Sequence, residues 1–343
     1  MTILRGPFAD LALATCLLLP VFTSVMTDIQ ATTMSSCHFA TDPAPAADTL
    51  PPGPPYRVLG QDKGKIAIVD PSGNVEWETP LRRHTAHDIQ LLPSGNILVT
   101  TDNVTIVEMT PDQKVVWKHV SKPKEGYTGA IEIHAFQRLA DGRTMVAETG
   151  NKRIIEVDAE DKIVKEIPLV VDKPHTHRDT RRARKLANGH YLVCHELDGI
   201  VREYDDVGKV VWSYKLDLAG RPATPGHEGH GTEVFNAIRR PDGNTIIAGG
   251  NNNRVFEVDP AGKVVWSIEH DELPGIKLAW VTSLQLKPNG NLIFGNTHAG
   301  PDNPQLIEVT RDKKVVWTLK DFKTFGNDLC ASQVINVEEG VVR

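Results

Sequence analysis

Short apolar and alternating runs recur along the chain, separated by polar turns. Residues 87–117 contain four such runs, and Pro-Ser-Gly-Asn and Pro-Asp-Gln lie between them. Runs of this length between turn residues predict an antiparallel meander of four strands. The ending Lys-Val-Val-Trp then returns at Trp117, Trp212, Trp266 and Trp317. A four-stranded unit that repeats about every 40 to 54 residues is typical of a β-propeller, in which each unit forms one blade.

The count of repeats predicts six blades. Complete units occupy residues 84–120, 131–169, 177–216, 229–270 and 279–321. Three further strands begin at Tyr56, and one more is expected at Ala331–Val337. We expect these four to form the closing blade, because a sheet shared by both ends of the array leaves only short edges. The predicted fold class is therefore all-β, a six-bladed propeller of four-stranded antiparallel blades.

The first 55 residues differ from the repeats. Arg5 precedes a mostly apolar run at residues 11–26, which resembles a secretory signal and is interrupted by Pro20. We therefore interpret residues 1–27 as a signal-peptide-like segment, 28–55 as a Pro/Ala-rich disordered linker and 56–343 as the propeller. The protein is expected to be exported, secreted or periplasmic, with no membrane span in the mature chain.

Charge and cysteine usage narrow the class further. The net charge of −6 and the lack of a basic block argue against nucleic acid as a partner. Cys194 and Cys330 fall in blades expected nearly opposite each other, so we do not expect a disulfide between them.

The loops divide into two sets. The turns between first and second strands, and between third and fourth strands, are short and belong to one face. The other face carries long, variable loops, and function usually lies on such loops. It also carries most of the histidines. Five groups from different repeats are the candidate catalytic residues, expected to converge on the channel axis: His87, His134, Arg178, His230 and His298.

A second set of polar residues near the same channel mouth could bind substrate. Arginine beside histidine suits an anionic ligand, because guanidinium bonds a carboxylate or sulfate while histidine acts as acid, base or nucleophile. The candidate substrate-binding residues are Asp88, Asp179, Arg181, His195, Trp280, Asn296 and Asn327. For Arg178, Asp179 and Arg181 the alternative is a salt-bridged network that braces their blade.

Two close histidine pairs suggest a divalent metal as a cofactor. The pairs are His175 with His177 and His227 with His230, whose spacings could place two imidazoles on one ion. Neither pair is a recognised zinc motif, so the metal and the cofactor stay open.

The repeat resembles that of known families. The segments Asp-Asp-Val-Gly-Lys-Val-Val-Trp (205–212) and Asp-Pro-Ala-Gly-Lys-Val-Val-Trp (259–266) are similar to repeats of PQQ-like, or quinoprotein-like, propellers. The stretch from His87-Asp88 to Leu92-Pro93 and Gly95-Asn96 resembles a segment of the bacterial arylsulfotransferase family. That family is exported and six-bladed, and the resemblance implies that His87 could take a sulfuryl group. Quinone-dependent dehydrogenases have eight blades, so six blades argue against bound PQQ.

Two function classes remain open from the sequence. One is an enzyme of lyase, hydrolase or transferase type, whose His/Arg-rich pocket binds a small anionic or polyhydroxylated substrate. The other is a non-catalytic scaffold that binds a peptide, glycan or partner protein at the cell envelope. Few aromatic residues lie in the long loops, which favours a pocket over a flat docking surface.

Overall fold

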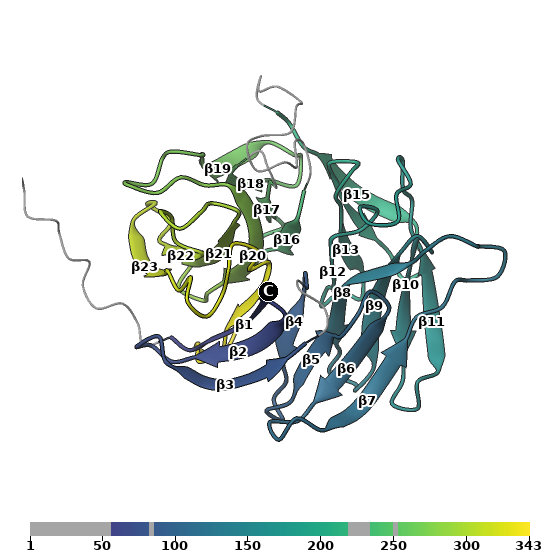
Figure 1. Cartoon of the computed structure of the whole chain (residues 1–343). Coiled ribbons are helices and arrows are strands. Elements are labelled where there is room, and N and C mark those ends of the chain that lie inside the picture. Colours follow the sequence, from purple (N-terminus) through teal and green to yellow (C-terminus); the bar gives the residue numbers. More distant parts are fainter. Residues whose placement is uncertain (1–55, 82–85, 219–233, 250–252) are drawn as a thin grey trace, which may run out of the picture. The chain divides into compact units, whose positions relative to one another are not determined.

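The computed structural model describes residues 56–81, 86–218, 234–249 and 253–343. These residues form six four-stranded antiparallel sheets arranged as blades around a central channel, as Figure 1 shows. They contain no helix, and so none that could span a membrane. The predicted fold class is confirmed. The segments interpreted as a signal (1–27) and a linker (28–55) lie outside the described residues.

In each blade the strands follow one another from the channel outward. Blade 1 consists of β24 (Ala331–Val334), β1 (Val58–Asp62), β2 (Lys65–Val69) and β3 (Val75–Pro80). Blade 2 consists of β4 (Ile89–Leu91), β5 (Ile97–Thr100), β6 (Thr105–Met109) and β7 (Val115–Val120). Blade 3 consists of β8 (Glu132–Arg138), β9 (Thr144–Thr149), β10 (Arg153–Val157) and β11 (Ile163–Pro168).

The other three blades have the same order. Blade 4 consists of β12 (Arg182–Lys185), β13 (Tyr191–His195), β14 (Ile200–Tyr204) and β15 (Val210–Lys215). Blade 5 consists of β16 (Asn236–Arg239), β17 (Thr245–Ala248), β18 (Val255–Val258) and β19 (Val264–Ile268). Blade 6 consists of β20 (Trp280–Leu286), β21 (Leu292–Thr297), β22 (Leu306–Val309) and β23 (Val315–Leu319).

Blade 1 closes the ring as predicted. Strand β24 pairs antiparallel with β1, and Val58 lies opposite Val334. This pairing completes the sheet with one C-terminal and three N-terminal strands. The inner strand ends at Val334, three residues earlier than expected.

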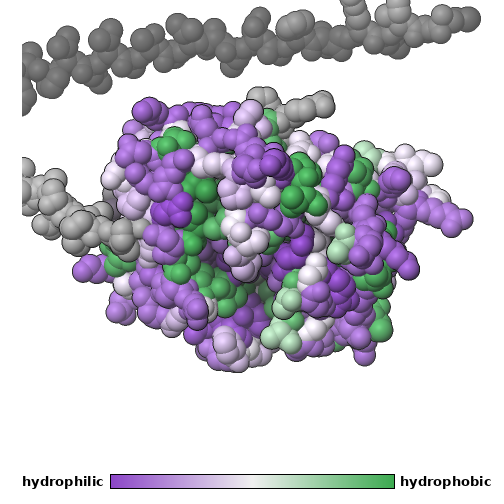
Figure 2. Space-filling model, turned by 90° about the horizontal axis from the view of Figure 1, so that it is seen from below, coloured by the Kyte–Doolittle hydropathy of each residue, from purple (hydrophilic) through white to green (hydrophobic). Residues whose placement is uncertain are grey.

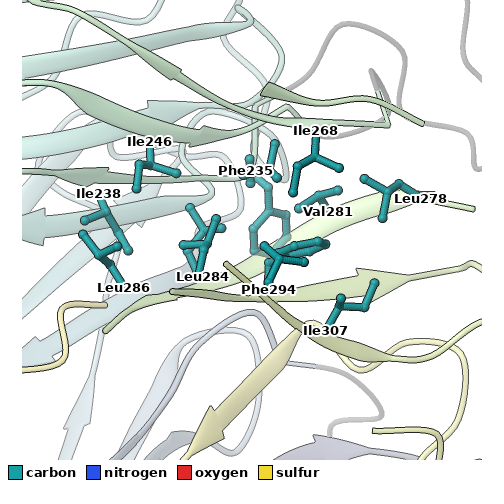
Figure 3. Close-up of a cluster of buried hydrophobic side chains, with 14 of the residues drawn as sticks. Phe235, Ile238, Ile246, Ile268, Leu278, Val281, Leu284, Leu286, Phe294 and Ile307 are labelled. Atoms are coloured by element: carbon teal, nitrogen blue, oxygen red, sulfur yellow. The ribbon is translucent and has the colours of Figure 1, made fainter. Parts of the chain in front are cut away.

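The hydrophobic core consists of six clusters, each between two neighbouring blades. Figure 3 shows the cluster between blades 5 and 6, where Phe235 and Ile238 of one blade pack against Leu284 and Phe294 of the next. The outer strands carry exposed valines such as Val116, and Figure 2 shows hydrophobic residues scattered among hydrophilic ones on one side of the molecule. Isolated exposed apolar residues of this kind are normal.

The repeated tryptophan and glutamate join neighbouring blades. The indole of Trp77 donates to the carbonyl of Pro111 in the next blade at 2.8 Å. In the same way Trp212 bonds the carbonyl of Pro260, and Trp266 bonds that of Arg311, each in the following blade. Glu108 accepts a hydrogen bond from Arg138 of blade 3 at 2.8 Å. These contacts explain why the glutamate recurs in every full repeat, and the tryptophan in every full repeat except blade 3, where Lys165 takes its place, without either belonging to a site.

A repeated glutamine connects the inner strands to one another. The side-chain carbonyl of Gln90 accepts from the backbone N–H of Arg138 at 2.9 Å, and Gln137 accepts from Lys185 at 2.9 Å. Gln285 and Gln333 bond the next inner strand in the same way. These bonds join the inner strands of blades 6, 1, 2, 3 and 4 in succession and help to hold the side chains facing the channel.

Cys194 and Cys330 are both buried free thiols, as expected. Burial raises the pKa of Cys330 to about 12, and Cys194 is shifted in the same direction by the same cause. Neither thiol is therefore a reactive group.

Candidate functional site

The inner strands begin with bulges at the long-loop face of the propeller. In blade 3, His134 is the extra residue between the pairs Ile133–Glu148 and Ala135–Ala147. In blade 4, both Arg181 and Arg182 lie opposite Cys194: the N–H of Arg181 bonds the Cys194 carbonyl, and Arg182 is its strand partner. A bulge redirects a side chain and is frequent beside functional sites. Two consecutive residues can therefore face the channel.

The hairpin glycines show that one repeat position supplies the channel mouth. The residue eight positions before Gly95, Gly142, Gly189, Gly243 and Gly290 is, in turn, His87, His134, Arg181, Phe235 and Thr282. The first four of these side chains meet in the structure, as their contacts show.

Arg181 is the centre of this group and is completely buried. Its Nη1 lies 2.9 Å from Nε2 of His87 and 3.1 Å from Nδ1 of His134. Its Nη2 donates to the buried carboxylate of Glu196. A single arginine thus joins blades 2, 3 and 4 below the channel mouth.

The arginine fixes the protonation state of both histidines. A guanidinium only donates hydrogen bonds, so Nε2 of His87 and Nδ1 of His134 must accept. Both imidazoles are therefore neutral at these contacts, and the proton of His134 resides on Nε2. That Nε2–H points to Oε2 of Glu132 at 2.8 Å.

Glu132 is shared by two histidines. It accepts a second hydrogen bond from Nδ1 of His177, also at 2.8 Å. Burial by itself would raise the pKa of Glu132, but the bonds from His134 and His177 outweigh it and hold that pKa well below its usual range. Glu132 is therefore a carboxylate at any physiological pH.

His177 is the member of the group that reaches solvent. Its side chain is 47% exposed, whereas the side chain of His134 is fully buried. Because Nδ1 of His177 donates to Glu132, its Nε2 carries the lone pair and can take up a proton. The ring centres of His134 and His177 are 4.9 Å apart, and those of His87 and His134 are 4.5 Å apart.

The same three side chains are the candidate metal-ligating group among the described residues. The donor atoms of Glu132, His134 and His177 lie within 4.8 Å of one another. However, Nε2 of His134 is protonated while Arg181 bonds Nδ1, so it has no lone pair for a metal. The group fits a hydrogen-bonded carboxylate better than a metal centre.

Aromatic side chains form the opposite side of the mouth. Phe235 packs edge-on against Trp280 with ring centres 5.2 Å apart, and the guanidinium of Arg181 lies 5.7 Å from the Trp280 ring. His298 lies 5.1 Å from Trp280 and bonds Asp328 at 2.5 Å. His298 also lines a separate cavity of about 440 Å³ between blades 5 and 6.

The structure separates the five predicted catalytic residues. His87 and His134 lie together on Arg181, and His298 reaches this group only through Trp280. Arg178 is half-buried in the turn before β12, where its backbone bonds His175 and Leu197. His230 lies outside the described residues.

Of the two histidine pairs considered for a metal, His227 and His230 lie outside the described residues. In the other pair, His175 is exposed and its Nδ1 accepts the backbone N–H of His177 at 3.2 Å. The imidazole of His177 instead bonds Glu132.

Asp179, Asn296 and Asn327, three of the predicted substrate-binding residues, bond backbone groups of the long loops. Asp179 accepts the backbone N–H groups of His175 and Gly150 and thereby holds a loop. Asn296 uses both ends of its amide on the backbone of Ala279 and Lys277. Asn327 bonds the backbone of the loop after β21.

His195 is fully buried and bonded at both ring nitrogens. Nδ1 bonds the carbonyl of Asp179 at 2.9 Å, and Nε2 bonds the hydroxyl of Tyr204 at 2.8 Å. Burial and the positive charge of Arg202 lower the pKa of His195 to about 4. His195 is therefore neutral and out of reach of a ligand at the mouth.

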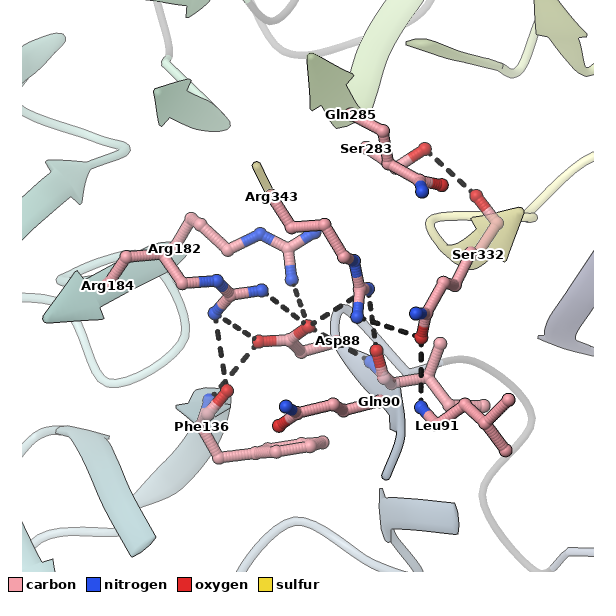
Figure 4. A network of polar contacts seen from close by, with 12 residues as sticks. Asp88, Gln90, Leu91, Phe136, Arg182, Arg184, Ser283, Gln285, Ser332 and Arg343 are labelled. Carbon is pink, nitrogen blue, oxygen red and sulfur yellow. Dashed lines mark hydrogen bonds and ion pairs between the residues drawn. The ribbon is translucent and has the colours of Figure 1, made fainter. Parts of the chain in front are cut away.

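Asp88 lies one step further along the channel, in a layer of its own. It forms ion pairs with Arg182 and Arg184, and its pKa is held well below its usual range by them in spite of its burial. Figure 4 shows Arg182, Arg184 and Arg343 turned toward this one carboxylate.

Sequence reasoning missed Glu132 and Phe235. A signal for Phe235 was present, because alignment on the hairpin glycines places it at the same position as His87 and His134. The same alignment identifies Arg181, and not Arg178, as the channel arginine. Glu132 has no equivalent signal, since it lies at a position that varies between repeats.

Fold and site together define a six-bladed β-propeller with a titratable group at one end of its channel. No family model and no curated protein matches the chain. Among solved structures, it is similar to a protein of unknown function from Bacteroides caccae, with 23% identity over 81% of this chain and 98% of that chain, and a TM-score of 0.68.

Two further similar structures are lyases. One is a streptogramin B lyase, with 12% identity over 78% of this chain and 84% of that chain, and a TM-score of 0.52. The other is a catalytically inactive virginiamycin B lyase from Staphylococcus aureus with quinupristin, with 13% identity over 81% and 88%, and a TM-score of 0.52. At this identity the likeness shows the shared propeller fold.

Proposed function

We propose that the channel mouth is an acid–base catalytic site that acts on a small polar substrate arriving from the long-loop face. The observation that carries this proposal is the pair His177 and Glu132, in which a partly buried carboxylate holds an exposed imidazole through Nδ1 at 2.8 Å. This is the arrangement by which a carboxylate orients a catalytic base and stabilises its protonated form.

The roles of the neighbouring groups follow from their contacts. Glu132 fixes the tautomer of His177, so that its Nε2 lone pair is the one presented to a substrate. Arg181 is fully buried, and it acts by holding His87 and His134 in position. The aromatic pair Phe235 and Trp280 gives the mouth an apolar side on which a ligand could pack.

A lyase reaction is the class that one base of this kind serves most directly. His177 would take a proton from a carbon of the substrate, the C–H electron pair would form a double bond, and the leaving group would depart with its own bonding pair. Two of the similar structures are named as lyases, which supports this class among acid–base reactions. The substrate class is a small polyhydroxylated or anionic molecule.

Sulfuryl transfer is a second candidate, supported by the resemblance of the His87-Asp88 segment to arylsulfotransferases and by the contact of His87 with Arg181. It ranks second because Nε2 of His87 accepts a hydrogen bond from Arg181. A substrate would have to displace that bond before this nitrogen could act as a nucleophile. We further propose that the protein is exported, on the basis of the apolar segment at residues 11–26.

The test uses three probes with the full chain: quinupristin, an oligosaccharide containing a uronic acid, and 4-nitrophenyl sulfate with a phenol acceptor. Mass spectrometry distinguishes the reactions, since ring opening by elimination conserves mass, hydrolysis adds one water, and sulfuryl transfer releases nitrophenol. We expect elimination. Replacing His177 with alanine should lower the rate by about a hundredfold or more, the usual contribution of a general base.

The matched control is His175→Ala, which removes an exposed imidazole from the same loop two residues away. It should retain full activity. Equal activity of the His177→Ala and wild-type proteins would refute the assignment of the base. Absence of turnover with all three probes would favour the scaffold class instead.

A further inference from the structure

The layer of the channel next to the His/Arg group contains three arginines and one carboxylate. Arg184 bonds Asp88 through two hydrogen bonds of 2.7 and 2.9 Å, Arg182 forms an ion pair with the same carboxylate, and Arg343 lies 4.0 Å from it (Figure 4). Their side chains are all at least four-fifths buried, and that of Asp88 is 1% exposed.

The charges of this layer do not balance. Among the described residues, every ion pair of Arg182, Arg184 and Arg343 goes to Asp88. Three buried positive charges are thus set against one negative charge. A buried charge without a counter-charge is costly, so such an excess is retained only where something else compensates it.

The environment of the arginines shows the same excess. Burial and the charges of Arg182 and Arg184 outweigh the attraction of Asp88 and lower the pKa of Arg343 to about 9. The Nε of Arg182 is buried and has no hydrogen-bond partner. Arg343 donates to the side-chain carbonyl of Gln333 and to the backbone carbonyl of Ile89, but these neutral partners do not offset its charge.

Arg184 is a departure from the repeat. Five residues before the hairpin glycine, blades 2, 3 and 6 have Gln90, Gln137 and Gln285, whereas blade 4 has Arg184 and blade 5 has Ile238. The glutamines bond the next inner strand, which the arginine does not do. Blade 4 therefore lacks this bond to the next inner strand and instead places a guanidinium charge in the channel, where it bonds Asp88 of blade 2 and the Phe136 carbonyl of blade 3.

A cavity lies directly beside these arginines at the hairpin end of the channel, away from His177. Its volume is about 730 Å³, and its lining includes Arg184, Arg239, Arg240, Arg343, Gln90 and Gln137. Arg239 and Arg240 are paired with Glu203 and Asp242, so they add donors without adding to the excess charge. Gln90 and Gln137 use their side-chain oxygens to bond the neighbouring inner strands. Their amide NH₂ groups make no hydrogen bond within the part of the chain that the structure describes, so these donors are available to a ligand.

We propose that this cavity is a second ligand site, which binds a small doubly charged oxyanion such as a phosphate group, a sulfate or a dicarboxylate. Arg184 and Arg343 are its primary donors, since they both face Asp88 and line the cavity. An anion of charge −2 restores neutrality to the three arginines and Asp88. Planar guanidinium groups bond such oxyanions through paired N–H donors.

The site is independent of the proposed catalytic group. It is lined by the inner strands at their hairpin ends, and it shares no residue with the set formed by Glu132, His134 and His177. A loss of activity at the mouth would therefore leave this site unaffected, and the reverse also holds.

The test is isothermal titration of the full chain with inorganic phosphate, sulfate and succinate, each at constant ionic strength set with sodium chloride. We expect saturable binding of at least one of the three with one site per chain. Comparison of the three identifies which chemistry the site prefers. If none competes with chloride, the proposal is wrong.

The decisive variant is Arg184→Gln, because it installs the residue that other blades carry at this position and should therefore fold. Its Kd should rise by about tenfold or more, as expected for the loss of one charge-assisted contact. Arg343→Gln, which lies on a different segment, should weaken binding similarly and serves as the second variant.

The matched control is Arg143→Gln. Arg143 is an arginine of the same hairpin face whose ion pairs go to Asp141 and Glu156, and it is not part of the cavity lining. Binding should be unchanged in this variant. Equal weakening in all three variants would mean non-specific attraction, and unchanged binding in Arg184→Gln would overturn the site.

Discussion

His177 and Glu132 come from neighbouring blades and meet through a 2.8 Å hydrogen bond at the channel mouth. Glu132 begins the inner strand of blade 3, while His177 lies in the loop that leads to blade 4. The pair therefore exists only when the two blades are correctly docked. Because Glu132 also bonds the fully buried His134 and His177 is half-exposed, the carboxylate connects the channel interior with the surface from which a substrate would arrive.

The first prediction concerns Glu132 and acid. Its pKa is depressed in the folded protein, so its stabilising effect is complete above its ordinary pKa of 4.5 and is lost as the pH falls toward the folded value. Glu132→Gln should therefore be less stable than wild type at pH 7 and should approach it below about pH 4. Urea denaturation at the two pH values measures this difference. A constant difference between the two proteins would contradict the assigned role of Glu132.

His195 also loses stability on acidification, but for a different reason, and gives the second prediction. Its folded pKa of about 4 lies below the ordinary 6.5, so the unfolded chain binds more protons between these values and stability falls on acidification through that window. The difference corresponds to at most roughly 3 kcal/mol. His195→Asn should lose part of this dependence between pH 7 and pH 4.5, as followed by urea denaturation. His190→Asn is the control, since His190 is partly exposed and pairs with Glu203 near a hairpin.

The fold was predictable because its determinants are local and repeated. Strand length, turn glycines and the recurring Lys-Val-Val-Trp indicate the blade, and leftover strands at both ends of the array indicate the closure by β24 and β1. A β-propeller buries its core between identical units, so a correct reading of one unit applies to all six.

The site was predictable only in part, because its residues lie where bulges at the start of the inner strands change which side chains face the channel. The bulge at His134 and the two residues opposite Cys194 break the alternation from which orientation is read. The partner of Arg181 is Glu196, from the loop after β13, and its identity could not be inferred without the positions of both loops. Arg178 is only three residues from Arg181, yet it lies in a turn.

The third prediction tests the closure of the ring. Deleting residues 331–343 removes β24, whose register with β1 runs from Val58–Val334 to Gln61–Ala331. The exposed edge of β1 should then favour association between chains. Size-exclusion chromatography should show aggregates, and the melting temperature should fall. A truncated protein that is monomeric and melts like the full chain would mean that β24 does not close the blade.

The fourth prediction concerns Arg181. Replacing it with glutamine removes the positive charge from a fully buried pair and leaves Glu196 without its partner. Removal of one member of a buried ion pair costs about 3 to 5 kcal/mol. Arg181→Gln should therefore be strongly destabilised, whereas Arg181→Gln combined with Glu196→Gln should recover part of the loss. Urea denaturation of the single and double variants gives the coupling energy.

The last prediction tests whether Asp88 relieves the repulsion between the three arginines of its layer. Asp88→Asn removes the only carboxylate that faces Arg182, Arg184 and Arg343 among the described residues, so three buried positive charges would repel one another. We expect a loss of about 3 to 5 kcal/mol in the free energy of unfolding. Adding Arg184→Gln to this variant removes one of the three charges and supplies an amide that can accept the backbone N–H of Arg239, as Gln137 accepts that of Lys185. The double variant should therefore be more stable than Asp88→Asn alone. If instead the two losses simply add, the repulsion between the arginines is not what Asp88 relieves, and the charge excess on which the second ligand site rests would be absent.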